Sequence, residues 1–156
     1  MSAATSASPS QSPPPTQIYL DFNGHCEAAI EFYRQHLGAD QIEMMRFSDN
    51  PEAGADCPQP GDKIMHGSFR IGGTQILASD CECGGSTNFA GFNLTYPAAD
   101  ADEARRVFGA LADGGKETMA LQPTFFAQLF GEVRDRFGVS WMVGVFHPCA
   151  TDDAQA

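Results

Sequence analysis

Apolar and polar residues alternate along the first half of the chain with periods typical of strands and of one helix. Apolar side chains recur at helical spacing after Asn23, which we predict to cap the helix, and Gly38 ends it. Two β-rich runs later flank the pair Gly72 and Gly73, a strong signal for a hairpin. The predicted elements are a strand at 18–22, a helix at 26–37 and strands at 42–47, 64–71 and 74–79.

The second half of the chain repeats this order. Asp100 and Glu103 have the spacing of a capping box, and Gly114 ends the helix that follows. An aromatic loop through Phe125 and Phe126 comes before the last hairpin. The predicted elements are a strand at 89–96, a helix at 101–112 and strands at 117–121, 133–136 and 140–146. The pattern predicts an α+β fold made of two βαβββ modules.

The ends of the chain differ from its middle. Residues 1–16 contain four of the ten prolines and no large apolar side chain beyond the initiator methionine, so we expect a disordered tail. Residues 149–156 predict a second flexible tail. Residues 17–148 then form a single domain, with modules at about 17–80 and 88–148.

Charge and composition exclude several classes of function. Twenty acidic residues oppose nine basic ones, which gives a net charge of −11 and argues against nucleic acid or an anionic membrane as a partner. No apolar run reaches the roughly 20 residues of a membrane span. The five cysteines are an odd number, and no secretory signal pattern is visible, so we expect a cytoplasmic protein.

Eight short motifs occur in an order that is typical of one superfamily. They are YLDFNG (19–24), AIEFY (29–33), LGA (37–39), HGSFRIGG (66–73), SD (79–80), FF (125–126), FGEV (130–133) and DRFGVSW (135–141). With the duplicated module, they resemble the PhnB-like group of the vicinal oxygen chelate superfamily, which includes glyoxalases, extradiol dioxygenases and bleomycin-binding resistance proteins. The resemblance implies two modules whose sheets curve into a cup, and a homodimer.

Enzymes of that superfamily hold a divalent metal on the first and last strands of each module. The matching positions here are Gln17 or Ile18, Leu77, Gly91 or Phe92, and Met142. At most one of them, Gln17, offers a hard donor, whereas such a site needs three or four. We therefore expect no metal cofactor, and the metal-dependent chemistry cannot be carried over.

Strand alternation indicates which side chains face the cup. His66, Ser68 and Arg70 alternate with residues that we expect to pack under a helix, so the three polar side chains face the ligand. The full set of expected ligand-contacting residues is Tyr19, Asp21, His66, Ser68, Arg70, Asn93, Thr95, Phe125 and Phe126.

Three members of this set, Asp21, His66 and Arg70, also have a second interpretation. Asp21 and His66 are candidates for a general acid/base pair, but His66 is equally well explained as a hydrogen-bonded structural residue. Arg70 is suited to bind a carboxylate or a phosphonate, or else it and Asp21 simply neutralise each other.

The other cysteines and histidines do not predict a metal site. Cys81 and Cys83 have the spacing of a soft-metal or redox pair, but they lack a second pair of ligands, and a linker that contains thiols is the favoured interpretation. His25, His36 and His147 lie at the ends of predicted elements and are expected to be exposed.

Two classes of function remain. The first is a metal-independent protein that binds a small organic molecule in its cup. The second is an enzyme, lyase- or oxygenase-like, that uses His66 and Asp21 or a metal held in a divergent place. The missing ligand set favours binding. A methyltransferase is not supported, because the chain lacks the strand, Gly-rich turn and helix of a nucleotide-like cofactor site.

Overall fold

The computed structural model describes residues 13–52, 60–80 and 87–148. Residues 13–16 of the predicted N-terminal tail are exposed and have no regular secondary structure. The rest of that tail, residues 149–156 and the pair Cys81 and Cys83 lie outside the described residues.

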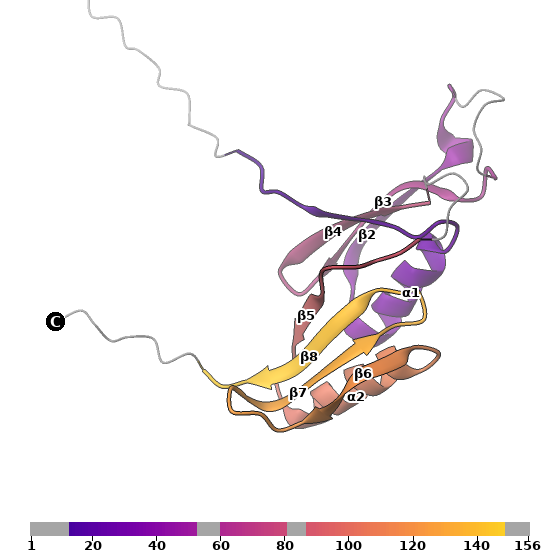
Figure 1. Ribbon diagram of the computed structural model, residues 1–156. Helices are drawn as coiled ribbons and strands as arrows, with labels where there is room; N and C mark the ends of the chain where they lie inside the picture. Colours follow the sequence, from indigo (N-terminus) through magenta and orange to yellow (C-terminus); the bar gives the residue numbers. More distant parts are fainter. Residues whose placement is uncertain (1–12, 53–59, 81–86, 149–156) are drawn as a thin grey trace, which may run out of the picture.

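The first module forms a four-stranded sheet with one helix on it (Figure 1). The strand order is β1-β4-β3-β2, with β1 parallel to β4 and the other neighbours antiparallel. Its elements are β1 (Ile18–Asp21), α1 (Cys26–Leu37), β2 (Asp40–Arg46), a short 3-10 helix (Phe47–Asp49), β3 (Ile64–Ile71) and β4 (Thr74–Ser79).

The second module has the same topology, with the strand order β5-β8-β7-β6. Here β5 runs parallel to β8, and the other pairs are antiparallel. Its elements are β5 (Leu94–Pro97), α2 (Ala101–Ala112), β6 (Lys116–Gln122), β7 (Ala127–Arg134) and β8 (Ser140–Phe146). The predicted α+β fold of two βαβββ modules is confirmed.

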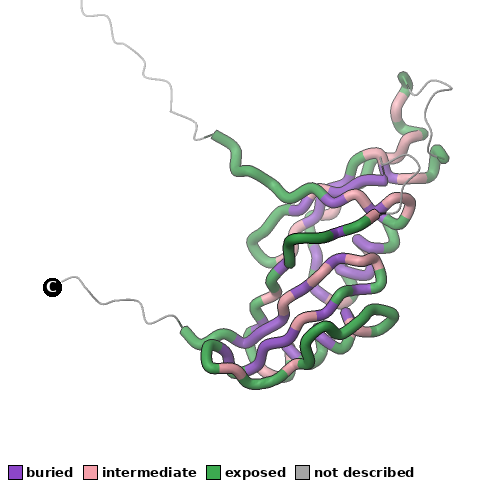
Figure 2. Tube along the Cα trace, in the orientation of Figure 1, coloured by how far each residue is buried: buried purple, intermediate pink, exposed green. Residues whose placement is uncertain are grey.

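A single core joins the two modules, and the buried stretches in Figure 2 run through both of them. Tyr33 of α1 stacks on Phe69 of β3, with ring centroids 5.9 Å apart, and meets Trp141 of β8 edge-on at 5.4 Å. Phe22, which follows β1, packs against Phe89 at 5.6 Å. One face of each sheet is thus buried under a helix, and the opposite face is the one that the helix does not cover.

Two strands of the second module differ in length from the prediction. The strand expected at 89–96 begins only at Leu94, because Gly91 has a φ of 80° that extended backbone does not allow. Strand β7 begins at Ala127, six residues before the prediction. Gly131 hid this strand in the sequence, yet it is required there, because an added Cβ would lie 2.8 Å from Cε2 of Phe108.

The helix caps also differ from the prediction. His25, not Asn23, is the N-cap of α1, and no side chain of its own segment caps the helix. Instead Asp80, which follows β4, accepts hydrogen bonds from the backbone N–H groups of Gly24 and Cys26. For α2, Asp100 accepts from the Glu103 N–H as predicted, but the Glu103 carboxylate bonds the N–H of Ala99, one residue before the cap.

Candidate functional site

The face of the first sheet that α1 does not cover carries a grid of mostly polar side chains. Alternation places His66, Ser68 and Arg70 of β3 on this face, whereas Phe69 points to α1. We call it the open face. One row of neighbouring residues crosses all four strands and consists of Tyr19, Leu77, Ser68 and Glu43.

A second row of the open face lies nearer to the β3–β4 turn. Arg70 pairs with Gln75 in the strand register, and the Gln17 Nε2 donates to the Gln75 Oε1 over 2.9 Å. On the other side of the central row lie Asp21, which pairs with Ser79, and His66, which pairs with Met45. The structure therefore brings together five of the nine expected ligand-contacting residues, namely Tyr19, Asp21, His66, Ser68 and Arg70.

Two aromatic rings lie near each other on this face. The ring centroids of Tyr19 and His66 are 6.0 Å apart, and Tyr19 is 50% exposed. The Asp21 carboxylate does not contact His66 in the part of the chain that the structure describes, because its Oδ1 accepts the N–H of Asn23 at 2.9 Å. A general acid/base pair of Asp21 and His66 is therefore not assembled in this conformation.

Arg70 is not neutralised by Asp21. Within residues 13–52, 60–80 and 87–148, it forms no ion pair, and its buried Nε has no hydrogen-bond partner. A pocket of about 270 Å³ lies against it, lined by Pro15, Thr16, Gln17, Arg70, Gly73, Thr74 and Gln75. The guanidinium thus borders a hollow lined with hydroxyl and amide groups.

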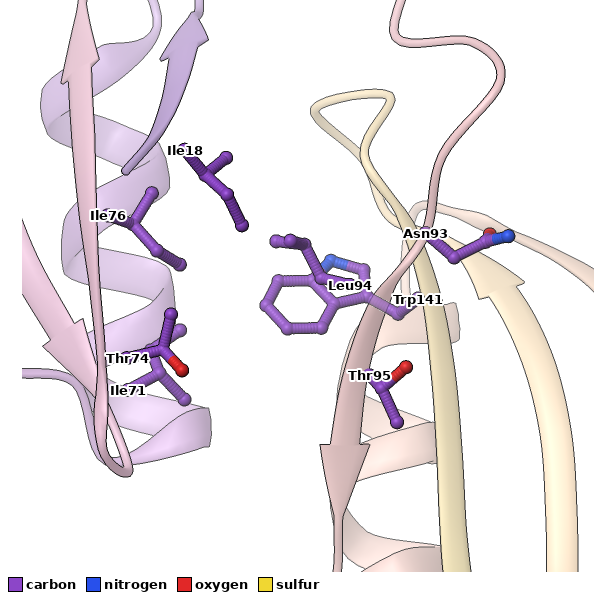
Figure 3. Close-up of a pocket in the computed structure, with 8 residues that line it drawn as sticks. All are labelled: Ile18, Ile71, Thr74, Ile76, Asn93, Leu94, Thr95 and Trp141. Atoms are coloured by element: carbon purple, nitrogen blue, oxygen red, sulfur yellow. The ribbon is translucent and has the colours of Figure 1, made fainter. Parts of the chain in front are cut away.

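Asn93 and Thr95 lie apart from the open face, in a crevice between the two modules. Figure 3 shows Ile18 and Ile76 of the first module pointing across this crevice toward Leu94 and Trp141 of the second. The crevice has a volume of about 180 Å³ and mostly apolar walls. The side chain of Asn93 points away from the first module, and Thr95 is the register partner of Met142.

The two aromatic residues expected to contact the ligand, Phe125 and Phe126, lie on the loop between β6 and β7. Phe125 is 96% exposed, and its ring meets that of Phe126 edge-on at 5.2 Å. Phe126 in turn packs on Phe130 at 5.0 Å, and its carbonyl accepts the N–H of His147. No contact joins these two rings to the open face of the first sheet among the described residues of this chain.

The side chains at the family's metal positions do not suit a divalent cation. The Gln17 amide is bonded to Gln75, Leu77 occupies the centre of the open face, and Met142 lies on a different sheet. Among the described residues, no three His, Cys, Asp or Glu side chains come together as a metal site would require. This donor set does not fit the metal that the superfamily's enzymes hold, and no reaction step is derived through one.

The alternation of residues missed part of the site. Gln75, Leu77 and Glu43 share the open face, but the strand register that places them beside Tyr19 and Ser68 is not visible from one strand alone. The apolar crevice around Ile18 and Trp141 was also not expected. Alternation along single strands carries no signal for the gap between the modules.

Comparison with solved structures defines the class of fold. The chain aligns with a glyoxylase/bleomycin resistance protein/dioxygenase domain from Frankia sp. EAN1pec at a TM-score of 0.60 and 15% identity, over 88% of this chain and all of that one. That likeness shows the fold alone. The protein has the glyoxalase/bleomycin resistance/dioxygenase fold.

More similar proteins identify the family. Residues 15–144 match the family described as 3-demethylubiquinone-9 3-methyltransferase, and the chain belongs to this PhnB-like family. Protein YjdN of Escherichia coli K12 is 38% identical over 84% of this chain and 95% of its own. Protein PA1353 of Pseudomonas aeruginosa is 40% identical with a TM-score of 0.73, over 86% of this chain and all of that one. The PhnB protein of Bacillus cereus is 26% identical with a TM-score of 0.71, over 85% of this chain and 99% of that one.

Proposed function

We propose that this PhnB-like protein binds a small organic molecule on the open face of its first sheet, without a metal. The observation that carries the proposal is the contrast between the two faces of that sheet. One is packed under α1, whereas the other carries the exposed side chains of Tyr19 and His66, the half-buried Arg70 and the buried Ser68. Convergent polar groups beside aromatic walls are typical of small-molecule sites.

Binding is favoured over catalysis for a geometric reason. The one acid/base pair that the sequence offers, Asp21 with His66, is not in hydrogen-bond contact, since Asp21 holds the turn at Asn23. The enzyme alternative would require that turn to rearrange before Asp21 could orient His66. A lyase- or oxygenase-like reaction is therefore the less supported function.

Chemical-shift mapping tests where a ligand binds. A library of small organic acids, amines and neutral aromatics would be titrated into ¹⁵N-labelled protein. We expect shifts that cluster on β1, β3 and β4 and that weaken in Tyr19→Ala and His66→Ala. Arg105→Ala is the matched surface control, because Arg105 lies on the exposed side of α2. Shifts centred on α1, on α2 or on the crevice of Figure 3 would contradict the proposal.

The absence of a metal belongs to the same proposal. Elemental analysis of the purified protein should find no nickel, zinc or iron in stoichiometric amount. One tightly held transition metal per chain, lost in Gln17→Ala or His66→Ala, would overturn this part of the proposal.

A homodimer completes the proposal. An exposed Phe125 next to Phe126, and strands β1, β2, β5 and β6 at the edges of the two sheets, are features that a second copy would cover. Light scattering should give twice the mass of 16.7 kDa at micromolar concentration, and Phe125→Ser with Phe126→Ser should shift it toward one chain. A wild-type mass of one chain would contradict the dimer.

The compartment is the last part of the proposal. No helix of the described residues is long and apolar enough to cross a membrane. We place the protein in the cytoplasm because its odd number of cysteines and its acidic charge of −11 suit a reducing, aqueous compartment.

A further inference from the structure

Arg70 stands apart from most arginines of the protein because it has no acidic partner. Five others, Arg34, Arg46, Arg105, Arg106 and Arg136, each form an ion pair with a nearby carboxylate. The chain has 20 acidic residues for nine basic ones, so partners are plentiful. Among the described residues Arg134 also forms no ion pair, but it is exposed at the end of β7, whereas the unpaired Arg70 is half-buried on the open face of the first sheet.

The unpaired atom of Arg70 is also buried. Its Nε is closed off from solvent and donates no hydrogen bond within the described residues. A buried donor on a charged group is costly to leave unsatisfied, so such groups ordinarily have partners. Because the Nε is closed off in this conformation, an acceptor supplied by a ligand satisfies it once the side chain turns toward the neighbouring pocket.

The pocket beside Arg70 has the chemistry of an oxyanion site. The pocket has a volume of about 270 Å³. The residues that line it include Thr16 and Thr74, which carry hydroxyl groups, and Gln17 and Gln75, which carry amides, but no residue with a carboxylate. Since Gln17 donates to the Oε1 of Gln75, the Nε2 of Gln75 is left as a donor. Asp40 is the register partner of Arg70 on β2, but it is exposed and forms no ion pair with it.

The neighbouring row of the open face has a different chemistry. Leu77 lies beside Ser68 at its centre, and the half-exposed ring of Tyr19 lies next to Leu77. The row of Arg70 and the row of Leu77 are two positions apart along the strands, which corresponds to about 6.5 Å. This distance is the length of one small ring or short chain. An anionic group at Arg70 would thus place an apolar body over Leu77 and against Tyr19.

From this arrangement we propose that the protein recognises small aromatic or apolar monocarboxylates. On binding, the Arg70 side chain turns its Nε–H toward the pocket, the carboxylate accepts from Nε–H and from the adjacent Nη–H, and the body of the ligand packs on Leu77 and Tyr19. Side-on pairing of this kind uses the planar fork of the guanidinium, which a lysine cannot supply. The inference rests on the proposed function, because it names the ligand class of the same open face.

A pair of probes isolates the carboxylate. Phenylacetate and 2-phenylacetamide have the same shape, but only the first is charged. We expect calorimetry to give at least tenfold tighter binding of phenylacetate, with the Arg70 Nε–H resonance shifting in the ¹⁵N spectrum. Acetate alone should shift the same resonance with lower affinity, because it lacks the body that contacts Leu77 and Tyr19.

Three variants test the role of the guanidinium. Arg70→Gln should lower phenylacetate affinity by about tenfold or more. Arg70→Lys should lower it by less, since lysine keeps the charge but not the planar fork of the guanidinium. Binding of 2-phenylacetamide should be unchanged in both. Arg105→Gln removes the same charge from an exposed helix and should leave both probes unaffected. Unchanged thermal unfolding of the Arg70 variants shows that the fold is intact.

The outcomes separate this inference from the proposed function. Equal binding of the two probes on the open face, insensitive to Arg70→Gln, would overturn the carboxylate site and leave small-molecule binding standing. No binding of phenylacetate up to about 10 mM, a concentration that detects even very weak complexes, would also overturn it. Library compounds that bind away from β1, β3 and β4 would overturn the proposed function itself.

Discussion

Tyr33 of α1 donates its hydroxyl hydrogen to the Oδ2 of Asp135 over 2.7 Å, although the two residues lie 102 positions apart. The indole Nε1 of Trp141 donates to the same oxygen at 2.9 Å. The other oxygen of Asp135 accepts the backbone N–H groups of Phe137 and Val139. A carboxylate that is only 3% exposed therefore joins the helix of the first module to the last hairpin of the second.

Loss of the Tyr33 hydroxyl should weaken this connection between the modules. In Tyr33→Phe the ring packing on Phe69 and Trp141 remains, but Asp135 loses one of its four donors. We expect the free energy of unfolding to fall by about 1–3 kcal/mol in urea denaturation. Tyr96→Phe is the matched control: its hydroxyl bonds Glu103 at a partly exposed site, and its loss should cost less than about 1 kcal/mol. Equal losses in the two variants would contradict a special role for the buried pair.

The protonation of Asp135 should respond to the same substitution. Burial raises its pKa above the ordinary value of 3.8, and the hydrogen bond from Tyr33 opposes that rise. Carboxyl ¹³C titration should therefore give a pKa above 3.8 in the wild type and a still higher pKa in Tyr33→Phe. Tyr96→Phe should leave the titration of Asp135 unchanged.

The sign of the linked pH dependence follows from the raised pKa. Because the folded state binds the proton more tightly than the unfolded chain, this group's contribution to stability is fully present below 3.8. It is lost as the pH rises through the pKa of the folded state. Denaturation of the wild type and of Asp135→Asn across this range should show a stability difference that falls with rising pH, and a difference that rises with pH would contradict the assignment.

A second buried carboxylate should be as sensitive to replacement. Asp80 is 1% exposed, and its two oxygens accept three backbone N–H groups, those of Gly24, Cys26 and Ile64. Asp80→Asn replaces one acceptor oxygen by a donor and should cost about 1–3 kcal/mol of stability. Asp21→Asn, where one oxygen holds one partly buried N–H, should cost less than about 1 kcal/mol in the same denaturation experiment.

Local patterns were sufficient to predict most of the fold. The helix stripe of 26–37, the Gly72–Gly73 hairpin and the repeat of the module all depend on neighbours in the sequence, and each appears in the structure. The cap of α1 did not follow from local pattern, because its acceptor, Asp80, lies more than 50 residues away from the helix start. Strand β7 was shortened in the prediction because Gly131 reads as a break until its close contact with Phe108 is known.

The candidate site was predictable to the extent that it lies on single strands. Alternation along β1 and β3 placed Tyr19, Asp21, His66, Ser68 and Arg70 on one face. The positions of Asn93 and Thr95 depend on how the two modules pack, and that packing rests on contacts between distant residues, such as those of Tyr33 with Asp135 and Trp141, rather than on any strand pattern. For the same reason the unpaired state of Arg70 could be seen only in three dimensions.

Two glycines of the second module should respond in opposite directions to alanine. In Gly131→Ala the new Cβ would lie 2.8 Å from Cε2 of Phe108 and 2.9 Å from Cα of Leu121, so the strand or the helix must shift. We expect a loss of about 1–3 kcal/mol in the free energy of unfolding, which is typical of overpacking in a core. Gly109 lies on the exposed side of α2 with open space around its Cα, so Gly109→Ala should gain about 0.5–1 kcal/mol through helix propensity. Urea denaturation of both variants checks the pair, and a stable Gly131→Ala would show that β7 does not pack as closely on α2 and β6 as described.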